Sequence, residues 1–332
     1  MSELMRKAMY YKELDRKALR CELCPQYCVI LPGEQGKCRG RENIDGILYC
    51  TNYALSVGLS RDPIEKKPLY HFRPGSTVIS LGPNSCNLAC RFCQNYTISQ
   101  SKSTTLPLSV DDLYRLVCEN SDIKQVAFTY TEPLTWYEYI LDFGRAHPDI
   151  DIILISNGFI NEEPLAELLP YVKAMNIDLK SSRDDFYIQQ CEGRLQPVMK
   201  SITMAYHAGV HLEITLLLIP GLNDASGDII QLRDLISNLD ANIPLHISAY
   251  YPDYLMSTPP TSIDDVSEAI TIVTEKLHYV YGGNLPVEDF MQTKCPSCSR
   301  ILIRREYGAV PLSFIVNGKC PACACDVYGV FD

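Results

Sequence analysis

Apolar and polar positions follow one rhythm through the middle of the chain and lose it near both ends. Between residues 76 and 278, short apolar runs rich in β-branched side chains alternate with longer segments in which apolar residues recur every three or four positions. The short runs predict buried strands, and the longer segments predict amphipathic helices. We expect strands at 76–81, 125–130, 149–156, 174–180, 210–219 and 243–251.

A helix is expected after each of these strands, at 109–120, 135–146, 163–174, 197–209, 228–239 and 262–278. Ser109 suits the N-cap of the first helix, with Asp112 three residues further on. Alternating strands and helices predict an α/β fold with a parallel sheet and crossover helices. Six such units are too few for a closed eight-stranded barrel, so a partial (β/α)6 barrel fits best, and a doubly wound sheet is the alternative. In both folds the carboxyl ends of the strands carry the chemistry.

Two flanking segments lack this alternation. Residues 1–70 form a cysteine-rich leader whose last part, within "RDPIEKKPLYHFRPG", predicts an extended connector. Residues 284–332 contain two Cys-Pro-x-Cys knuckles separated by a strand-like stretch. We therefore expect three parts, with residues 71–283 as the central α/β unit.

Bulk properties narrow the location and the partners. The 332 residues contain no apolar run close to the roughly 18 needed to cross a membrane, and the N-terminus lacks the apolar core of a secretion signal. We expect a cytoplasmic protein without a membrane partner. The net charge of −10 disfavours sequence-independent binding of nucleic acid, although a local basic patch could still bind an RNA such as tRNA.

The 15 cysteines point to metal rather than to disulfides, because most of them are grouped and reduced thiols are expected in the cytoplasm. Four lie between Cys21 and Cys38, three between Cys86 and Cys93, and five between Cys295 and Cys325. The three that stand apart are interpreted as small buried core residues: Cys50, Cys118 and Cys191.

The central group, Cys86, Cys90 and Cys93, follows the first predicted strand directly. Three thiolates can bind three irons of a [4Fe–4S] cluster and leave the fourth iron open to a small molecule, as catalytic metal sites do. A zinc knuckle with a distant fourth ligand, or three buried thiols, is the alternative.

This CxxxCxxC motif resembles the signature of the radical S-adenosylmethionine (SAM) superfamily, and Phe92 matches the aromatic residue before its last cysteine. The resemblance implies that the amino and carboxylate groups of SAM chelate the open iron. An electron from the reduced cluster then breaks a carbon–sulfur bond of SAM, which releases methionine and a 5′-deoxyadenosyl radical. The expected electron donor is a reduced flavodoxin or a ferredoxin-type protein.

Later strand ends carry further matches in order: "YTEP", "SNG", "IDLK" and "LLIPGLND". Tyr130 and Thr131 depart from the glycines usual before the Glu-Pro pair. Asp178 and Lys180 match positions that face the ribose and the carboxylate of SAM, and His246 follows on the sixth strand, where a packed core histidine fits slightly better. The implied cofactor-binding residues are Phe92, Tyr130, Glu132, Ser156, Asp178, Lys180 and His246.

A narrower resemblance extends over nearly the whole chain. The segments "CELCPQYCVILPGEQGKCRGRE", "DPIEKKPLYHF" and "HISAYYPDY" are similar to the radical SAM enzyme of the AmmeMemoRadiSam system, which is related to pyruvate formate-lyase activating enzymes. This resemblance implies Memo-like and Ammecr-like partner proteins and supplies no secure substrate.

The last group of cysteines has nearly the spacing of a zinc ribbon, with Cys295, Cys298, Cys320 and Cys323 as ligands. We expect zinc there, and a rubredoxin-type single iron is the alternative because the spacing does not separate the two metals. Cys325 is one thiol too many and is interpreted as a bystander.

The leader group, Cys21, Cys24, Cys28 and Cys38, fits neither the ferredoxin run nor a standard zinc finger. Structural zinc and an auxiliary [4Fe–4S] cluster both remain open, with zinc slightly favoured. A zinc ion would indicate a fixed lid over the barrel mouth, whereas a cluster would indicate electron relay or substrate anchoring.

The expected function is a radical SAM enzyme that abstracts hydrogen from an unidentified protein, tRNA or metabolite. Activation of a glycyl-radical enzyme is the alternative within this class. A metal-stapled binding scaffold is the alternative of another class, and the presence of Glu132, Asp178 and Lys180 argues against it. Simple electron transfer is disfavoured because it needs no open iron.

Overall fold

The computed structural model describes residues 5–119 and 124–331. Its largest sheet has nine strands in the order β15-β14-β13-β12-β11-β10-β8-β7-β9. From β15 to β8 neighbouring strands are parallel, and β7 and β9 continue the sheet in antiparallel pairs. The strands are β7 Leu55–Pro63, β8 Thr77–Pro83, β9 Leu106–Pro107, β10 Gln125–Phe128, β11 Asp151–Ser156, β12 Val172–Asp178, β13 His211–Leu218, β14 Leu245–Ala249 and β15 Val280–Gly283.

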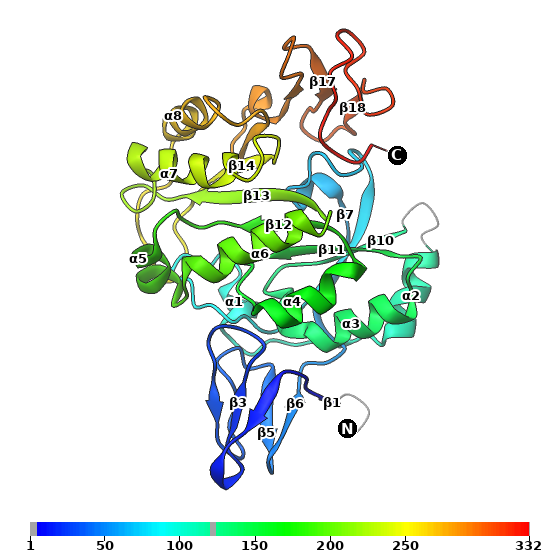
Figure 1. Cartoon of the computed structure of the whole chain (residues 1–332), viewed down its shortest axis with the longest axis vertical. Coiled ribbons are helices and arrows are strands. Elements are labelled where there is room, and N and C mark those ends of the chain that lie inside the picture. Colours follow the sequence, from blue (N-terminus) through cyan, green and yellow to red (C-terminus); the bar gives the residue numbers. More distant parts are fainter. Residues whose placement is uncertain (1–4, 120–123, 332) are drawn as a thin grey trace.

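Helices connect the parallel strands and cover one face of the sheet (Figure 1). The helices are α1 Tyr96–Ser99, α2 Val110–Glu119, α3 Tyr137–Ala146, α4 Glu162–Leu168, α5 Asp184–Phe186, α6 Leu195–His207, α7 Ser226–Ser237 and α8 Ile263–Val273. The expected N-cap of α2 is present, since Ser109 Oγ accepts a hydrogen bond of 3.1 Å from the backbone N–H of Asp112.

The α/β class, the six predicted strands and the mostly parallel order are confirmed. The helix predicted for 163–174 is too long, because α4 ends at Leu168 and β12 begins at Val172. Pro170 lies between them and has no N–H with which to continue the helix. Strand β15 was not expected, and its four residues carry little signal of their own. The expected leader also contributes β7 to the main sheet.

The core fills both faces of the sheet. On the helix side, leucine, isoleucine and phenylalanine side chains from every parallel strand except β15 are fully buried in one cluster. On the other face, Val78, Ala127 and Ala174 pack against Leu69 and Phe72 of the connector. Each large apolar side chain buried in this way contributes about 1.5–3 kcal/mol. The connector thus closes the amino end of the strands and leaves space at the carboxyl end.

Of the three isolated cysteines, Cys50 and Cys191 are buried as expected, but Cys118 is exposed. The prediction for Cys118 is wrong because α2 turns Leu113 and Val117 toward the core, and the residue after Val117 points away from it.

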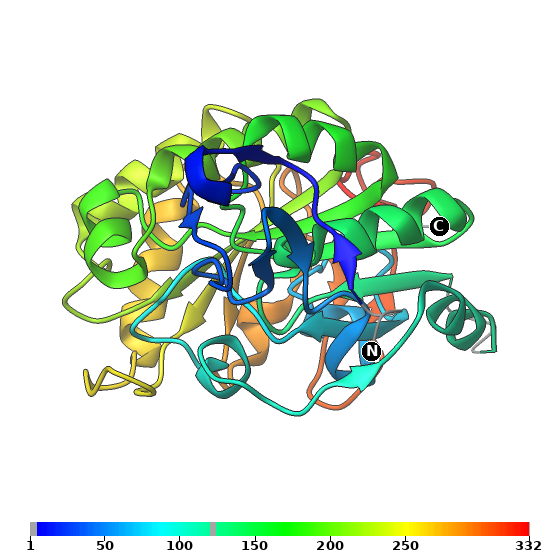
Figure 2. The same cartoon turned by 90° about the horizontal axis from the view of Figure 1, so that it is seen from below.

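Small sheets flank the main sheet at opposite ends of the molecule (Figure 1). The leader forms the sheets β1-β6-β5 and β2-β3-β4, which lie over the middle of the molecule when it is seen from below (Figure 2). The C-terminal segment forms the sheet β16-β17-β18. The strands are β1 Arg6–Lys7, β2 Tyr11–Glu13, β3 Leu19–Cys21, β4 Val29–Ile30, β5 Arg41–Ile44, β6 Ile47–Cys50, β16 Thr293–Lys294, β17 Ile301–Arg304 and β18 Leu312–Ser313.

One buried carboxylate fastens the leader to the main unit. Glu138 of α3 forms an ion pair of 2.5 Å with Arg41 of β5, and both side chains are almost fully buried. The same carboxylate accepts hydrogen bonds from the backbone N–H of Met9, at 2.7 Å, and from the thiol of Cys50, at 2.8 Å. A buried pair satisfied by these extra donors fixes the position of the leader sheets on α3.

Candidate functional site

The loop after β8 carries Cys86, Cys90 and Cys93 at the carboxyl edge of the parallel sheet. A π-helical turn, Tyr187–Cys191, holds this loop in place. The backbone N–H of Ala89 donates to the Cys191 carbonyl at 2.9 Å, and that of Arg91 donates to the Gln190 carbonyl at 2.9 Å. The three thiols thus stand on a loop supported from behind by backbone hydrogen bonds.

All three thiols line an open cavity with a volume of about 760 Å³. Within the described ranges 5–119 and 124–331, their sulfur atoms do not form a group whose members all lie within 4.8 Å of one another. Zinc–sulfur bonds of 2.3 Å would bring thiolates on a single ion to about 3.8 Å from one another. The sulfur atoms of Cys86, Cys90 and Cys93 are therefore not gathered as the ligands of one ion would be.

Burial dominates the electrostatics of two of these thiols, Cys86 and Cys93. It raises the pKa of Cys86 well above its usual value, and the charge of Glu132 adds to that shift. Burial also raises the pKa of Cys93, whose sulfur lies 3.2 Å from Ser99 Oγ. Without metal these two groups are neutral thiols at neutral pH, so metal binding releases protons.

The same cavity brings together most of the side chains expected to bind the cofactor. Phe92, Tyr130, Glu132, Asp178 and Lys180 all line it. Lys180 Nζ lies 3.0 Å from Asp178 Oδ2 and 5.9 Å from the centre of the Phe92 ring. A cation, an anion and an aromatic ring thus stand together beside the cysteine loop.

Glu132 also joins the carboxyl ends of two neighbouring strands. Its Oε1 accepts hydrogen bonds from the Leu134 N–H at 3.0 Å and the Ser156 hydroxyl at 2.8 Å, and its Oε2 accepts one from the Asn157 N–H at 2.7 Å. Burial raises the pKa of Glu132 to about 7, and these three hydrogen bonds oppose the shift. The expected role of Ser156 changes accordingly, since it is buried and contacts Glu132 without lining the cavity.

His246 is not brought together with the other expected residues. It lies deeper in the sheet, with its Nε2 2.6 Å from Oε2 of the fully buried Glu213. It lines a neighbouring cavity that shares Ser248 and Asn284 with the cavity of the cysteines. The packed interpretation fits this position, because the ring is buried and paired.

Sequence reasoning did not single out Asn157 and Lys67. Asn157 Nδ2 donates to Asn87 Oδ1 at 2.9 Å and lies 3.9 Å from Cys86 Sγ. Lys67 is almost fully buried, pairs with Asp62 at 2.8 Å and stands 4.9 Å from the centre of the Tyr130 ring. Asn157 is the middle residue of "SNG", which offered a signal, whereas a lysine in a connector carries none.

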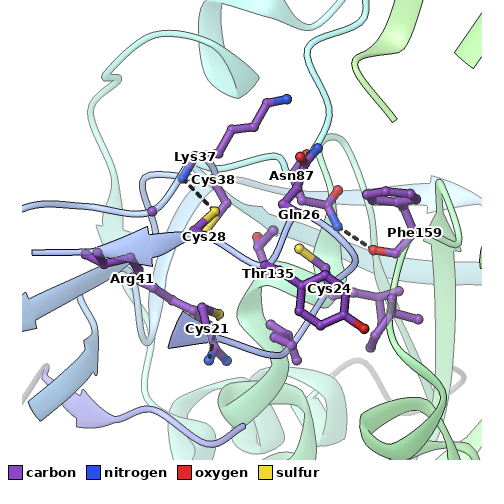
Figure 3. A pocket seen from close by; sticks show the side chains of 16 residues that line it. Cys21, Cys24, Gln26, Cys28, Lys37, Cys38, Arg41, Asn87, Thr135 and Phe159 are labelled. Atoms are coloured by element: carbon purple, nitrogen blue, oxygen red, sulfur yellow. Dashed lines mark hydrogen bonds between the residues drawn. The ribbon is translucent and has the colours of Figure 1, made fainter. Parts of the chain in front are cut away.

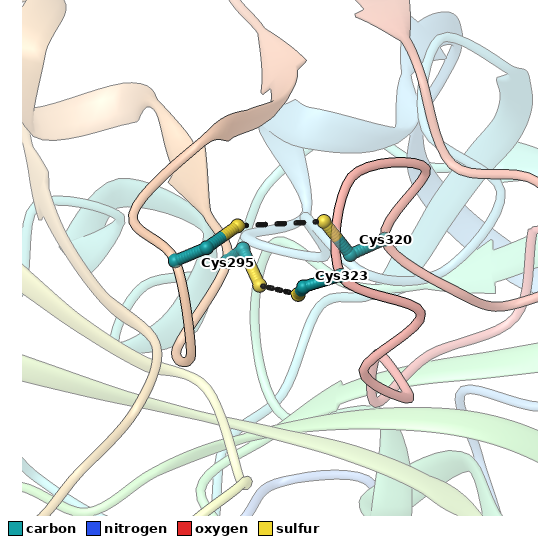
Figure 4. A group of neighbouring side chains, drawn as sticks. Cys295, Cys320 and Cys323 are labelled. Atoms are coloured by element: carbon teal, nitrogen blue, oxygen red, sulfur yellow. Dashed lines mark hydrogen bonds between the residues drawn. The ribbon is translucent and has the colours of Figure 1, made fainter.

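The sulfur atoms of the C-terminal cysteines lie closer together than those of Cys86, Cys90 and Cys93. The ligand atoms of Cys295, Cys298, Cys320 and Cys323 all lie within 4.8 Å of one another. Two pairs of these sulfur atoms, joined by dashed lines in Figure 4, lie 3.5 Å and 3.7 Å apart. These distances are close to the sulfur–sulfur distance of about 3.8 Å expected between thiolates on one tetrahedral zinc ion. Cys325 lies outside this group.

The leader cysteines form a third site. Cys21, Cys24, Cys28 and Cys38 surround an enclosed pocket that is also lined by Asn87 (Figure 3). Burial raises the pKa of Cys38 to about 11, against the effect of the Gly40 N–H.

Comparison with known proteins assigns the family. Residues 82–236 match the model of the radical SAM superfamily. An uncharacterized protein of Methanocaldococcus jannaschii is 39% identical over 329 residues, which covers 96% of this chain and 98% of that protein. The chain belongs to the radical SAM superfamily.

One similar solved structure agrees with this chain at the level of the fold. A radical SAM methyltransferase from Sphaerobacter thermophilus is 15% identical, with a TM-score of 0.51 over 64% of this chain and 67% of that chain. A domain of a pyruvate-formate lyase-activating enzyme from Bacteroides vulgatus is 22% identical, with a TM-score of 0.41 over 48% of this chain and 98% of that chain.

Across the described residues, none of the helices has the length and apolar character needed to cross a bilayer.

Membership in this superfamily implies a [4Fe–4S] cluster and SAM, and the residues present fit both. The three thiols line one cavity, which is large enough for a nucleoside-sized ligand beside a cluster on those thiols.

Proposed function

We propose that this protein cleaves SAM reductively and directs the resulting 5′-deoxyadenosyl radical to a C–H bond of its substrate. One observation carries the proposal: three cysteines, spaced too widely for a single ion, open on the same cavity as Glu132, Asp178 and Lys180. When bound to the three thiolates, a [4Fe–4S] cluster supplies the electron and an open iron for SAM.

The residues of the chain would then bind and orient SAM. The Lys180 ammonium is suited to the SAM carboxylate, and Asp178, 3.0 Å away, to a ribose hydroxyl. The Phe92 ring lies near enough to Lys180 to pack beside the adenine. Tyr130, which follows β10, and Lys67 of the connector together form one wall of the cavity and would limit entry of water on that side.

Further parts of the proposal concern the setting of the reaction. We propose that the mostly parallel sheet is the superfamily's partial barrel and that Cys295, Cys298, Cys320 and Cys323 hold a structural zinc ion.

The sequence resemblance supports a role in the AmmeMemoRadiSam system, with Memo-like and Ammecr-like partners and a flavodoxin- or ferredoxin-type donor. The substrate would be a protein, a tRNA or a metabolite; activation of a glycyl-radical enzyme is the alternative. Grouped, unpaired thiols support a cytoplasmic location.

A cleavage assay tests the proposal. The protein, purified and reconstituted without oxygen, is reduced in the presence of SAM, and 5′-deoxyadenosine is measured by mass spectrometry. The wild type should form it, and Cys90→Ala should lower the yield to background because one cluster ligand is lost. Cys118→Ala is the matched control, since Cys118 is exposed on α2. Full cleavage by Cys90→Ala would refute the site.

A further inference from the structure

The leader holds four cysteines close to the loop of Cys86, Cys90 and Cys93, which is the proposed catalytic loop. Cys21 ends β3, Cys24 and Cys28 lie in the loop that follows, and Cys38 lies just before β5. All four line one enclosed pocket, and Figure 3 shows their side chains arranged around it. The pocket is built from two parts of the chain, because Asn87 and Phe159 form its far wall.

Two of these sulfur atoms, those of Cys28 and Cys21, have a hydrogen-bond donor close by. The backbone N–H of Lys37 donates to Cys28 Sγ at 3.4 Å. The guanidinium of Arg41 lies 4.0 Å from Cys21 Sγ and is held there by its buried ion pair with Glu138. Such donors stabilise the negative charge of metal-bound thiolates and raise the reduction potential of an iron–sulfur cluster.

The sulfur atoms of the leader cysteines are gathered less tightly than those of the C-terminal group. The C-terminal group of the same chain has its four ligand atoms within 4.8 Å of one another, as a single ion requires. Among the described residues, no three of Cys21, Cys24, Cys28 and Cys38 converge to that distance. A four-iron cluster places its own irons and sulfides between its ligands, so its thiolates stand farther apart than those on one ion.

We infer that Cys21, Cys24, Cys28 and Cys38 bind a second [4Fe–4S] cluster, with a thiolate on every iron. The sequence spacing slightly favours zinc at this position, and the positions of the sulfur atoms favour the cluster. With all four irons ligated, this cluster has no open position for SAM or for a substrate, and its remaining chemistry is the transfer of single electrons.

The contacts of the leader with the catalytic loop indicate where that electron goes. Gln26, between Cys24 and Cys28, donates through Nε2 to the Asn87 carbonyl at 2.9 Å and to the Glu192 carbonyl at 2.8 Å. Asn87 lines the leader pocket and is the residue next to Cys86. A residue in the wall of the leader pocket, Asn87, is therefore the direct neighbour in sequence of Cys86, a proposed ligand of the catalytic site.

This placement suits a relay, a part of the inference that rests on the proposed function. A low-potential one-electron protein, of the flavodoxin or ferredoxin class, would reduce the leader cluster from the 2+ to the 1+ state. The leader cluster would return to 2+ as it passes that one electron to the site of Cys86. The arrangement would let the large donor dock on the leader instead of over the SAM cavity.

Metal analysis of a variant without the catalytic ligands tests the assignment. Cys86→Ala, Cys90→Ala and Cys93→Ala are combined, and the protein is reconstituted without oxygen. We expect about four irons and about four sulfides per chain to remain, with about one zinc. Adding Cys24→Ser and Cys38→Ser should remove that iron, whereas adding Cys118→Ser should not. Loss of all iron from the triple variant, with about two zinc ions retained, would overturn the second cluster.

The same analysis separates the two proposals. If the wild type holds about four irons and the triple variant none, the catalytic cluster stands and the leader cluster fails. If the wild type and the triple variant hold the same iron, the leader cluster stands and the proposed function fails.

Electron paramagnetic resonance of the reduced wild type gives a readout that does not depend on the folding of a variant. Two clusters should give about two spins per chain, of which SAM alters only one. One spin per chain, or an effect of SAM on both signals, would overturn a fully ligated second cluster.

The relay is tested by the rate at which the catalytic cluster is reduced. In Cys24→Ser/Cys38→Ser, reduction by flavodoxin should slow by an order of magnitude, while reduction by dithionite, a small molecule, should keep its rate. An unchanged rate with flavodoxin would overturn the relay.

Discussion

Asn157 shows how single side chains hold the catalytic loop. Its amide donates to Asn87 Oδ1 at 2.9 Å and accepts from the backbone N–H of Phe159 at 2.8 Å. Asn87 in turn donates to the Phe159 carbonyl at 2.7 Å. These buried hydrogen bonds connect the loop of Cys86 to the end of β11, so the position of Cys86 depends on a neutral amide rather than on a charge.

Replacement of this amide should cost stability. Asn157→Ala leaves two buried groups without partners, the Phe159 N–H and the side-chain oxygen Oδ1 of Asn87. This loss should lower the free energy of unfolding by about 1–3 kcal/mol. Urea denaturation of the metal-free protein measures the change. Asn238→Ala, at the end of α7, should have a small effect, because the contact of that residue with Asp234 uses its backbone N–H. Equal losses in the two variants would contradict this role for Asn157.

The connector and the C-terminal segment meet at a buried histidine. His71 Nδ1 lies 2.6 Å from the Tyr328 carbonyl, which can only accept, so this nitrogen carries the proton and Nε2 accepts from the Tyr281 hydroxyl. Burial lowers the pKa of His71 to about 3 from its usual 6.5. The neutral ring thus joins the connector, β15 and the last residues of the chain.

This histidine predicts acid sensitivity. Between pH 6.5 and 3 the unfolded His71 binds a proton that the folded form excludes, so the free energy of unfolding falls as the pH falls. The loss attributable to His71 should be about 2 kcal/mol at pH 5. Chemical denaturation from pH 7.5 to 5 measures it, and His71→Gln should flatten that part of the slope because glutamine does not titrate. The same slope in both proteins would contradict the assignment.

The zinc ion proposed for the C-terminal cysteines should stabilise the strands around them. The core beneath them is small, with Leu302, Ile303 and Val327 as its main aliphatic residues. Structural zinc contributes roughly 10–16 kcal/mol of binding free energy in small domains at pH 7. Cys298→Ser should therefore lower the local stability of residues 293–331 by several kcal/mol, seen as faster hydrogen exchange, while the iron content per folded chain is retained. Loss of iron together with this stability would instead mean that the module holds iron.

At the scale of the whole molecule, the three cysteine groups occupy different parts of one frame. The leader cysteines belong to the part of the chain that the Arg41–Glu138 ion pair holds against α3. The group of Cys86, Cys90 and Cys93 lies at the carboxyl edge of the main sheet. The last group lies in the C-terminal segment, at the opposite end of the molecule from the leader (Figure 1). This order places the catalytic loop beside the leader and away from the C-terminal group, which suits a relay at one end and a structural staple at the other.

The sequence predicted the parallel strands because their apolar runs are long and are separated by clear helices. It missed β15, which has only four residues, and it overextended α4, where Pro170 ends the helix before the apolar pattern ends. Motifs at the strand ends predicted the residues of the cavity, since the ends of parallel strands meet at one edge. Ser156 and His246 do not line that cavity, because hydrogen bonds to Glu132 and Glu213 keep them inside the sheet.

The sequence could not specify the distances between sulfur atoms. The spacing of cysteines along the chain is nearly as compatible with one metal as with another, whereas convergence in space depends on which strands and loops carry them. Lys67 illustrates the same limit, because only the folded connector brings it to Tyr130 and Asp62.

The central claim is that the cluster on Cys86, Cys90 and Cys93 has an open iron that SAM occupies. The most direct measurement is electron–nuclear double resonance on the reduced protein with SAM isotopically labelled in its amino and carboxylate groups. We predict magnetic coupling from both labelled groups to one cluster, and its loss in Cys90→Ala. A reduced cluster that shows no coupling to either group under saturating SAM would contradict the account.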